Sequence, residues 1–190
     1  VQLKRTQALL DAAEKEECTQ PAVADTLRDA LAESDVALET LLDVPQQRLA
    51  SDLADYGLPV TGIAQLDQAI LHRLRGRIHY CLGDSESALS EGERGLAALD
   101  VAEPDFIEFS YHRSLARLYE ERGKLYHCLT FLFVLDQNPE GIDTLKKGIQ
   151  AYGQCLQWAE LAPVDQYLQN VIVPLCDDGL AELKDAGGVE

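Results

Sequence analysis

Two arginine-rich segments of the sequence carry side chains suited to binding acidic groups. They cover residues 72–83 and 112–123 and read HRLRGRIHYCLG and HRSLARLYEERG, so that His, Arg, a small residue, Arg and Gly recur at an offset of 40 residues. Arginine presents a planar fork that binds carboxylate or phosphate groups through two hydrogen bonds. Residues four apart lie on one face of a helix, and this spacing separates the arginines of each pair, Arg73 with Arg77 and Arg113 with Arg117.

A second interpretation of these arginines stays open. Charged residues on helices are commonly solvated or paired with one another. The arginines could therefore pair with the chain's own carboxylates, for example Glu86, Glu120 or Glu121.

The histidines and cysteines offer another kind of chemistry, metal binding or nucleophilic catalysis. His72 and His79 are seven residues apart, whereas helical metal sites favour pairs at i and i+4, as in H-E-x-x-H. His127 and Cys128 are adjacent, and adjacent side chains on a helix point apart, so they do not form a nucleophile with its base. The sequence has no P-loop, G-x-G-x-x-G or G-x-S-x-G motif. We expect no metal, no cofactor and no enzymatic activity, and we expect His72 and His112 to pack partly buried between helices.

Composition narrows the fold class and the class of partner. The chain has 190 residues, of which 46% are hydrophobic, and it carries 33 acidic against 16 basic residues, for a formal charge of −17. Such a charge repels phosphate backbones, so we do not expect a nucleic acid as partner. The abundance of Leu and Ala, with only seven prolines, favours helices over strands. The predicted fold is all-α in a single domain.

The cysteines and the N-terminus indicate a soluble protein of the cytoplasm. The five cysteines form no C-x-x-C pair and no regular spacing, so we expect reduced, buried thiols and neither a disulfide framework nor a zinc site. No apolar run approaches the roughly 20 residues that span a bilayer, and the first residues lack the apolar core of a signal peptide. We therefore expect no membrane partner. The absence of methionine, even at position 1, indicates a trimmed part of a longer product.

Apolar residues at helical spacing predict the elements that must position these side chains. The predicted helices cover residues 2–18, 21–42, 46–56, 63–82, 85–99, 106–122, 124–136 and 139–161, with a last helix that begins near residue 163. The connections between them are short, which implies antiparallel hairpins packed side by side.

A few residues mark the boundaries of these helices. Gly83 ends one helix, and Asp84 can cap the next. Pro104 opens the helix that follows, and Gly123 ends it. Pro174 is expected to kink or break the last helix, because proline lacks the amide hydrogen and clashes with the preceding turn.

The spacing of small residues in this series resembles the tetratricopeptide repeat. Gly76, Gly83 and Ala88 stand where that family has the small residue of its first helix, the glycine that ends this helix, and the small residue of its second helix. The sequence departs from the family by placing His72 and His112 at the usual tryptophan position, and by a spacing of 40 residues where 34 is usual. The second copy supplies Leu115, Ala116, Tyr119, Gly123 and Cys128 at the matching places.

The resemblance implies a right-handed superhelix of stacked hairpins, whose first helices face a concave groove. The single domain would then consist of N-terminal helices (1–62), two repeat-like hairpins (63–142) and C-terminal capping helices (143–190). In some members of the family, basic groove residues hold the terminal carboxylate and the acidic side chains of a partner's C-terminal peptide. By the same resemblance, Arg73 and Arg113 would be equivalent, as would Arg77 and Arg117, with Tyr80 on the same strip.

These inferences combine into a predicted function, a non-enzymatic protein–protein interaction module. As an adaptor or scaffold it would bind an acidic peptide segment or C-terminus of a partner, with Arg73, Arg77, Arg113 and Arg117 holding acidic groups and Tyr80 packing against the ligand. One alternative is a constitutive subunit of a homo- or hetero-oligomer that docks through apolar residues of the C-terminal helices. The other is an α-bundle enzyme or metal-binding protein that uses the histidines.

Overall fold

The computed structural model describes residues 8, 23–43, 60–135 and 137–188, and the regular structure of these residues is entirely helical. The all-α class predicted from composition is confirmed for this part of the chain. The helices predicted over 2–18 and 46–56 lie outside the described residues, apart from residue 8. The described helices are α2 (Ala24–Asp43), α4 (Val60–Cys81), α5 (Ser85–Glu108), α6 (His112–Leu135), α7 (Glu140–Glu160) and α8 (Val173–Gly187), with a π-helical turn, η2 (Leu168–Ile172), before α8.

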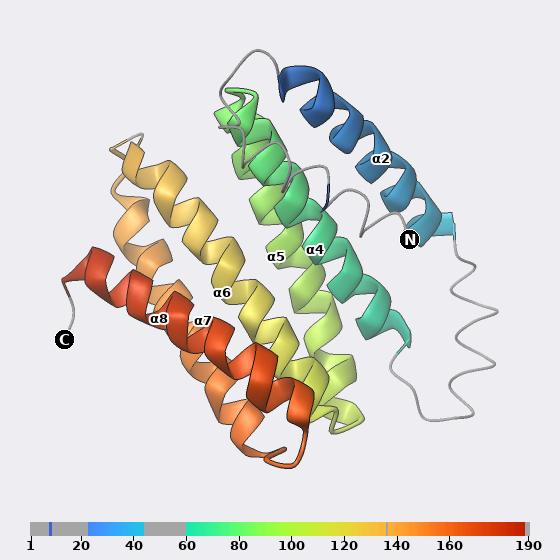
Figure 1. Cartoon of the computed structure of the whole chain (residues 1–190), viewed down its shortest axis with the longest axis vertical. Helices are drawn as coiled ribbons and strands as arrows, with labels where there is room; N and C mark the ends of the chain where they lie inside the picture. Colours follow the sequence, from blue (N-terminus) through green and yellow to red (C-terminus); the bar gives the residue numbers. More distant parts are fainter. Residues whose placement is uncertain (1–7, 9–22, 44–59, 136, 189–190) are drawn as a thin grey trace.

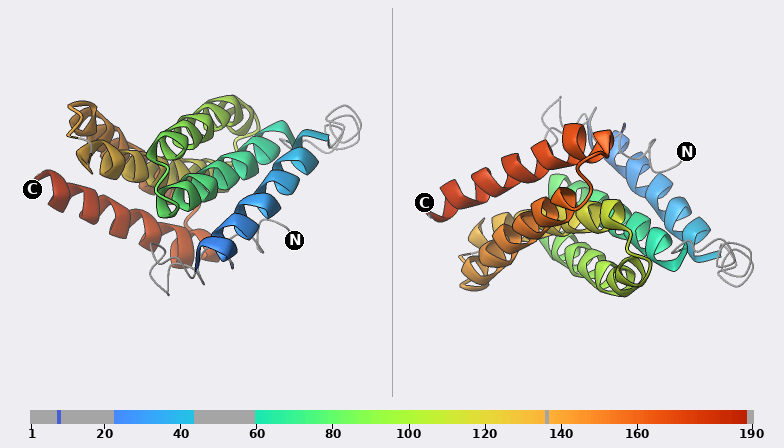
Figure 2. Two further views of the ribbon diagram at one scale, coloured as in Figure 1. Left: turned by 90° about the horizontal axis from the view of Figure 1, so that it is seen from above. Right: turned by 90° about the horizontal axis from the view of Figure 1, so that it is seen from below.

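Two hairpins form the body of the molecule (Figure 1). Helix α4 packs along α5, α6 packs along α7, and α6 also contacts α4 and α5. Helices α4 and α6 run in the same direction. Arg73 pairs with Glu121 and, further along both helices, Tyr80 contacts the ring of Phe131. Helix α2 contacts α4, and α8 contacts α7 and α6. Figure 2 shows α2 and α8 on the side of α4 that faces away from α5.

Two clusters of buried apolar side chains form the core. The larger cluster joins both hairpins to η2 and α8, and its fully buried members include Leu99, Phe106, Leu115, Leu118 and Leu168. The smaller cluster joins α2 to α4 through Val23, Leu27, Ala30, Leu74 and Ile78.

A buried polar network fixes α4 between α2 and α5. Oε2 of Glu91 lies 2.7 Å from Nδ1 of His72, and its Oε1 lies 3.1 Å from Nε of Arg75. Arg75 also donates a hydrogen bond to Oγ of Ser34 and pairs with Asp35 on α2. Burial alone would raise the pKa of Glu91, but the hydrogen bond with His72 and the charge of Arg75 hold it below its ordinary value. His72 is partly buried between helices, as the sequence predicts.

Helix α5 is longer than the sequence predicts. It continues through Pro104 to Glu108, whereas the prediction ended a helix at residue 99 and opened another at 106. A proline inside a helix removes one hydrogen bond and clashes with the preceding turn. Phe106, just beyond it, is fully buried and packs so closely on Gly62 of α4 that a Cβ there would lie 3.0 Å from the ring. The burial of Phe106 therefore keeps α5 continuous, although Pro104 disfavours the interior of a helix.

Gly123 does not end a helix. It lies inside α6, so the two helices predicted over 106–122 and 124–136 are one helix. The ring of Tyr152 fills the space beside Gly123, where a Cβ would lie 2.5 Å from Cε1 of the ring. The chain turns earlier, just before α6, where Ser110 has a φ of +54°.

The 40-residue sequence repeat is therefore not the structural repeat. The hairpins begin with α4 at residue 60 and with α6 at residue 112, an offset of 52 residues. His72 lies in the middle of α4, whereas His112 is the first residue of α6. The arginines that follow these histidines consequently occupy different places in their helices, and α6 pairs with α7 to form the second hairpin.

Two other boundary signals, at Gly83 and Asp84, are confirmed. Gly83 follows the end of α4 with a φ of +80°, a conformation that favours glycine. Asp84 caps α5 by accepting a hydrogen bond from the backbone N–H of Ser87, 3.1 Å away. Pro174 does not break the chain of helical residues: it stands in the first turn of α8, which follows the π-helical turn η2 directly.

A disulfide joins α7 to α8, contrary to the prediction of reduced thiols. Cys155 and Cys176 are bonded, and Cys81 is also disulfide-bonded, whereas Cys128 keeps its thiol. The bonded residues are 21 positions apart, a separation that forms no motif, and only the packing of α8 on α7 brings them together. Disulfides are typical of oxidising compartments, so the cytoplasmic location stays a prediction that this bond does not support.

Candidate binding cavity

A cavity of about 750 Å³ opens between α4, α6 and α8. This volume is typical of sites that hold a small molecule or a few side chains of a peptide. Helix α5 contributes Ala88 and Gly92 to its wall, and α7 contributes Tyr152. The main wall residues are Arg73, Gly76, Arg77, Tyr80 and Cys81 of α4; Lys124, Leu125, His127, Cys128, Leu129, Phe131 and Leu132 of α6; and Leu175, Asp178, Gly179 and Glu182 of α8.

Three cations line the side of the cavity formed by α4 and α6. Arg73 has only 10% of its side chain exposed and pairs through Nε with Glu121. Burial alone would lower the pKa of Arg73, but the adjacent Glu121 carboxylate holds it above its ordinary value. Lys124 pairs with Glu120, one turn earlier on α6, and Arg77 is the third cation. The buried carboxylates of α6 thus offset the charges of Arg73 and Lys124.

The side of the cavity formed by α8 is acidic. Asp178 and Glu182 line it from positions four residues apart, on one face of the helix. His127 of α6 faces Glu182 with 3.8 Å between Nδ1 and Oε2. The cavity therefore carries cations on one side and carboxylates on the other.

Apolar side chains stand where the cavity opens to solvent. Phe131 of α6 is 50% exposed and Leu175 of α8 is 40% exposed, although both line the cavity. Tyr80 of α4 packs edge-to-face on Phe131, with 5.6 Å between ring centroids. The buried Leu129 and Leu132 continue this apolar surface inward. A ligand in the cavity could therefore contact apolar side chains as well as the cations.

Tyr152 of α7 reaches the cavity between α6 and α8. Its ring lies against Gly123 and Gly179, where Cβ atoms would lie 2.5 and 2.4 Å from ring carbons. Burial raises the pKa of the Tyr152 hydroxyl, and the nearby Cys128 and Glu120 raise it further. The hydroxyl therefore stays neutral at physiological pH, and it can contribute hydrogen bonds but no charge.

Three of the five predicted ligand-binding residues line this cavity: Arg73, Arg77 and Tyr80. The alternative that the arginines pair with the chain's own carboxylates is confirmed for Arg73, whose partner is Glu121. Whether these residues bind a peptide stays a prediction.

Arg113 and Arg117 lie elsewhere. Arg113 is 52% exposed; its Nε lies 3.4 Å from Oδ2 of Asp165, and its guanidinium stacks over the ring of Tyr167 at 4.6 Å. Arg117 lies near Asp67 of α4; burial raises the pKa of that carboxyl, and the charge of Arg117 partly opposes the rise. The predicted strip of four arginines is not formed, because α6 starts out of register with the sequence repeat.

Sequence reasoning missed most of the α6 and α8 contribution to the cavity. Residues 124–136 were predicted as a separate, buried helix, so Lys124 was not connected to the segment before it. Glu120, Lys124 and Cys128 recur every fourth residue, and this spacing would have placed them on one face had 112–135 been taken as a single helix. No local signal could have placed α8 beside them.

The histidines do not form a metal site in the described part of the chain, where no three His, Cys, Asp or Glu side chains gather closely enough to hold an ion. His112 instead packs on Trp158, with 5.8 Å between ring centroids. None of the described helices combines the length and the apolar character needed to cross a bilayer.

Comparison of the chain with protein-family models, with curated proteins and with solved structures finds no match. The cavity itself is therefore the basis for inferring what the chain does.

Proposed function

We propose that this chain is a non-enzymatic protein–protein interaction module, an adaptor or scaffold, whose cavity binds a short acidic segment or C-terminus of a partner protein. One observation carries the proposal: although the chain has a formal charge of −17, Arg73, Arg77 and Lys124 converge on one cavity beside an apolar opening. Convergent polar groups in a largely apolar pocket are the usual mark of a binding site.

The charges around the cavity favour a ligand with one or two carboxylates rather than a long acidic run. Glu121 pairs with Arg73 and Glu120 pairs with Lys124, and Asp178 and Glu182 on α8 would repel further negative charge. Arg77 carries a guanidinium that remains charged at any physiological pH and can hold a carboxylate through two hydrogen bonds.

The apolar opening sets the second requirement on the ligand. Phe131 and Leu175 expose large apolar surfaces at the mouth, and burying such surface on binding contributes most of the affinity of small interfaces. We therefore expect a segment in which a Leu or Phe side chain packs on Phe131 and Leu175 while a nearby Asp, Glu or terminal carboxylate contacts Arg77.

The proposal keeps one feature of the tetratricopeptide resemblance, first helices that line a groove. Helices α4 and α6 begin the two hairpins and form one side of the cavity, and α8 forms the other. The longer offset between the hairpins and the internal position of Gly123 set this chain apart from the usual repeat.

Titration with short fluorescent peptides tests this function. The peptides pair one Leu or Phe with one Asp or Glu, internally or at a free C-terminus, and they are compared with peptides whose acid is replaced by its amide. We expect acid-dependent binding that weakens as salt rises from about 0.05 to 0.5 M, because salt screens charge pairs. Arg77→Ala should weaken it about 10- to 100-fold, the effect of losing a charged hydrogen bond.

Arg113→Ala is the matched control, because it removes the same side chain from a position outside the cavity. It should leave peptide affinity unchanged. Equal loss in the two variants, or equal binding of the acid and amide peptides, would contradict an acid-specific cavity.

Exposed apolar side chains at the α6–α7 end favour a second candidate, a subunit that docks through this surface. Phe131, Val134 and Leu135 of α6 and Ile142 of α7 are all at least half exposed there. An apolar interface does not weaken with salt. Self-association or partner binding that persists at high salt, and that Val134→Asp abolishes, would favour this function over the first.

A further inference from the structure

Helix α8 closes the cavity, although few of its own side chains are buried. It supplies Leu175, Asp178, Gly179 and Glu182 to the wall. Its buried residues are only Cys176, Gly179 and Leu183, with Val173 and Leu180 partly buried against the core. Few apolar side chains of α8 itself therefore anchor it, and the buried Leu168 and Ile172 of η2 anchor only the segment before it.

The contacts that α8 makes are close but small. Gly179 fits against the Tyr152 ring, and Leu183 fits beside Gly148 of α7, where a Cβ would lie 2.6 Å from Cδ1 of Leu183. The polar contact between His127 of α6 and Glu182 of α8 spans 3.8 Å from Nδ1 to Oε2. These contacts fix the position of α8 once it is docked, but few side chains make them.

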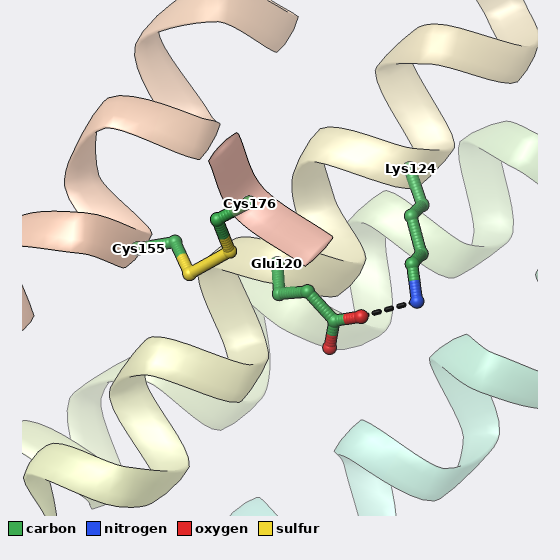
Figure 3. The surroundings of a disulfide bond; sticks show 4 residues. All are labelled: Glu120, Lys124, Cys155 and Cys176. Carbon is green, nitrogen blue, oxygen red and sulfur yellow. Dashed lines mark ion pairs between the residues drawn. A yellow bond between two sulfur atoms is a disulfide. The ribbon is translucent and has the colours of Figure 1, made fainter. Parts of the chain in front are cut away.

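Docking of α8 also covers charged groups. Figure 3 shows the Glu120–Lys124 ion pair beside the disulfide that reaches α8. Glu120 and Glu121 are both nearly buried. Carboxylates lose hydration when they are covered, so water favours the state in which α8 has moved away. A covalent link between α7 and α8 would oppose this undocking.

The Cys155–Cys176 disulfide supplies that opposition. It ties the first turn of α8 to α7, and both cysteines are fully buried. Closing a loop of 21 residues removes chain entropy from the undocked state, which shifts the docking equilibrium by a factor on the order of 100.

We propose that this disulfide is what keeps α8 docked, so that the cavity is a binding site only in the oxidised protein. The inference extends the proposed function, because it concerns the regulation of the same cavity. In the reduced protein α8 detaches from α6 and α7, the acidic side of the cavity is lost, and the Glu120–Lys124 pair becomes hydrated.

Reduction requires a dithiol. Because both cysteines are buried, the contact between α7 and α8 must first open locally. The thiolate of the dithiol then attacks one sulfur of the Cys155–Cys176 bond and forms a mixed disulfide, and its second thiol displaces the protein sulfur. Two electrons and two protons pass to the protein, which gains two thiols, while the dithiol becomes a cyclic disulfide. Oxidation of the two thiols during folding is the reverse exchange with a disulfide donor.

Amide hydrogen exchange on the full chain tests the proposal without any ligand. Because Cys81 is disulfide-bonded as well, a reductant would break more than one bond, so the variant Cys155→Ala/Cys176→Ala is used. We expect the amides of α8 to exchange about 100-fold faster in this variant than in the oxidised protein. Exchange in α4, α5 and α6 should be unchanged.

The two single variants, Cys155→Ala and Cys176→Ala, separate loss of the bond from loss of packing. Each single substitution breaks the bond completely, so the amides of α8 should exchange as fast in each single variant as in the double variant. If lost side-chain packing caused the faster exchange, the effects of the two single substitutions would add in the double variant. Unchanged exchange in α8, additive effects, or a loss of protection throughout α4 to α7 would each overturn the proposal.

Peptide titration of the same variants distinguishes this proposal from the proposed function. If the oxidised protein binds acidic peptides, the double variant should bind them at least 10-fold more weakly, and equal affinity would overturn the dependence of binding on the bond. If neither form binds peptides while α8 exchanges faster in the variant, the proposed function fails and the disulfide still holds α8.

Discussion

The Tyr152 ring is held between two glycines on different helices, and this contact decides how α6, α7 and α8 meet. Gly123 lies on one side of the ring and Gly179 on the other, each too close to accept a side chain. In protein interiors even one added methyl group must displace its neighbours. These glycines therefore serve packing, although glycine lowers the intrinsic stability of a helix.

Substituting Gly123 tests this packing role. We expect Gly123→Ala to destabilise the fold by about 1–3 kcal/mol, because the new Cβ would overlap the buried Tyr152 ring. Gly153→Ala is the control: Gly153 also lies inside a helix, α7, but a Cβ there meets nothing within 4 Å. It should stabilise the fold by up to about 1 kcal/mol through helix propensity. Urea unfolding measures both, and a stabilising Gly123→Ala would contradict the contact.

Glu91 makes the stability of the α2–α4–α5 network depend on pH. Its pKa is held below the ordinary value of 4.5 by His72 and Arg75, against the effect of burial. The folded protein therefore binds fewer protons at Glu91 than the unfolded chain does, so this contribution is complete above pH 4.5 and is lost as pH falls below it. Urea unfolding between about pH 7 and pH 3 should show stability falling with acid.

The variant Glu91→Gln isolates this effect. It should be less stable by roughly 3 kcal/mol near pH 7, because it leaves part of a buried ion pair without its partner. It should also lose less stability on acidification than the unmodified protein. Parallel curves for the two proteins would show that other carboxylates cause the acid dependence.

At the scale of helices, prediction from sequence succeeded where local signals and packing agree. The ends of α4 and α7 match the predicted 63–82 and 139–161 within a few residues, and Gly83 ends the first of these helices as the sequence suggests. Pro104 and Gly123 misled the prediction, because each lies in a helix that long-range packing holds together. Phe106 and Tyr152, the residues responsible, give no sign of their partners in the sequence.

Only part of the candidate site could be predicted from the sequence. Arg73, Arg77 and Tyr80 were found because they share one face of α4, a helix whose bounds were nearly right. Arg113 and Arg117 were misplaced with the start of α6. The α8 side of the cavity depends on Cys155 meeting Cys176 and on Tyr152 meeting Gly179, and contacts between distant helices leave no periodic trace in the sequence.

Pro104 offers a test of the continuous α5. If α5 passes through this exposed position, Pro104→Ala restores the missing N–H and removes the clash with the preceding turn. We expect the free energy of unfolding to rise by about 1 kcal/mol. This is less than the full cost of a proline inside a helix, because alanine also raises the conformational entropy of the unfolded chain. A destabilising Pro104→Ala would instead indicate that the proline begins a helix, as the sequence alone suggests. Urea unfolding measures the change in stability, and circular dichroism measures the change in helix content.

The whole molecule carries a formal charge of −17, and its acidic surface responds to salt much more strongly than its buried ion pairs do. Salt shortens the reach of surface repulsion from about 30 Å at 0.01 M to about 3 Å at 1 M, whereas it scarcely reaches buried pairs such as Arg73 with Glu121. We therefore expect the thermal midpoint to rise with NaCl. A variant with Asp29→Asn, Glu93→Gln and Asp177→Asn removes three exposed charges, so it should start with a higher midpoint at low salt and gain less from added salt. A midpoint that falls with salt in both proteins would mean that attraction between charges, rather than surface repulsion, governs the stability of this fold.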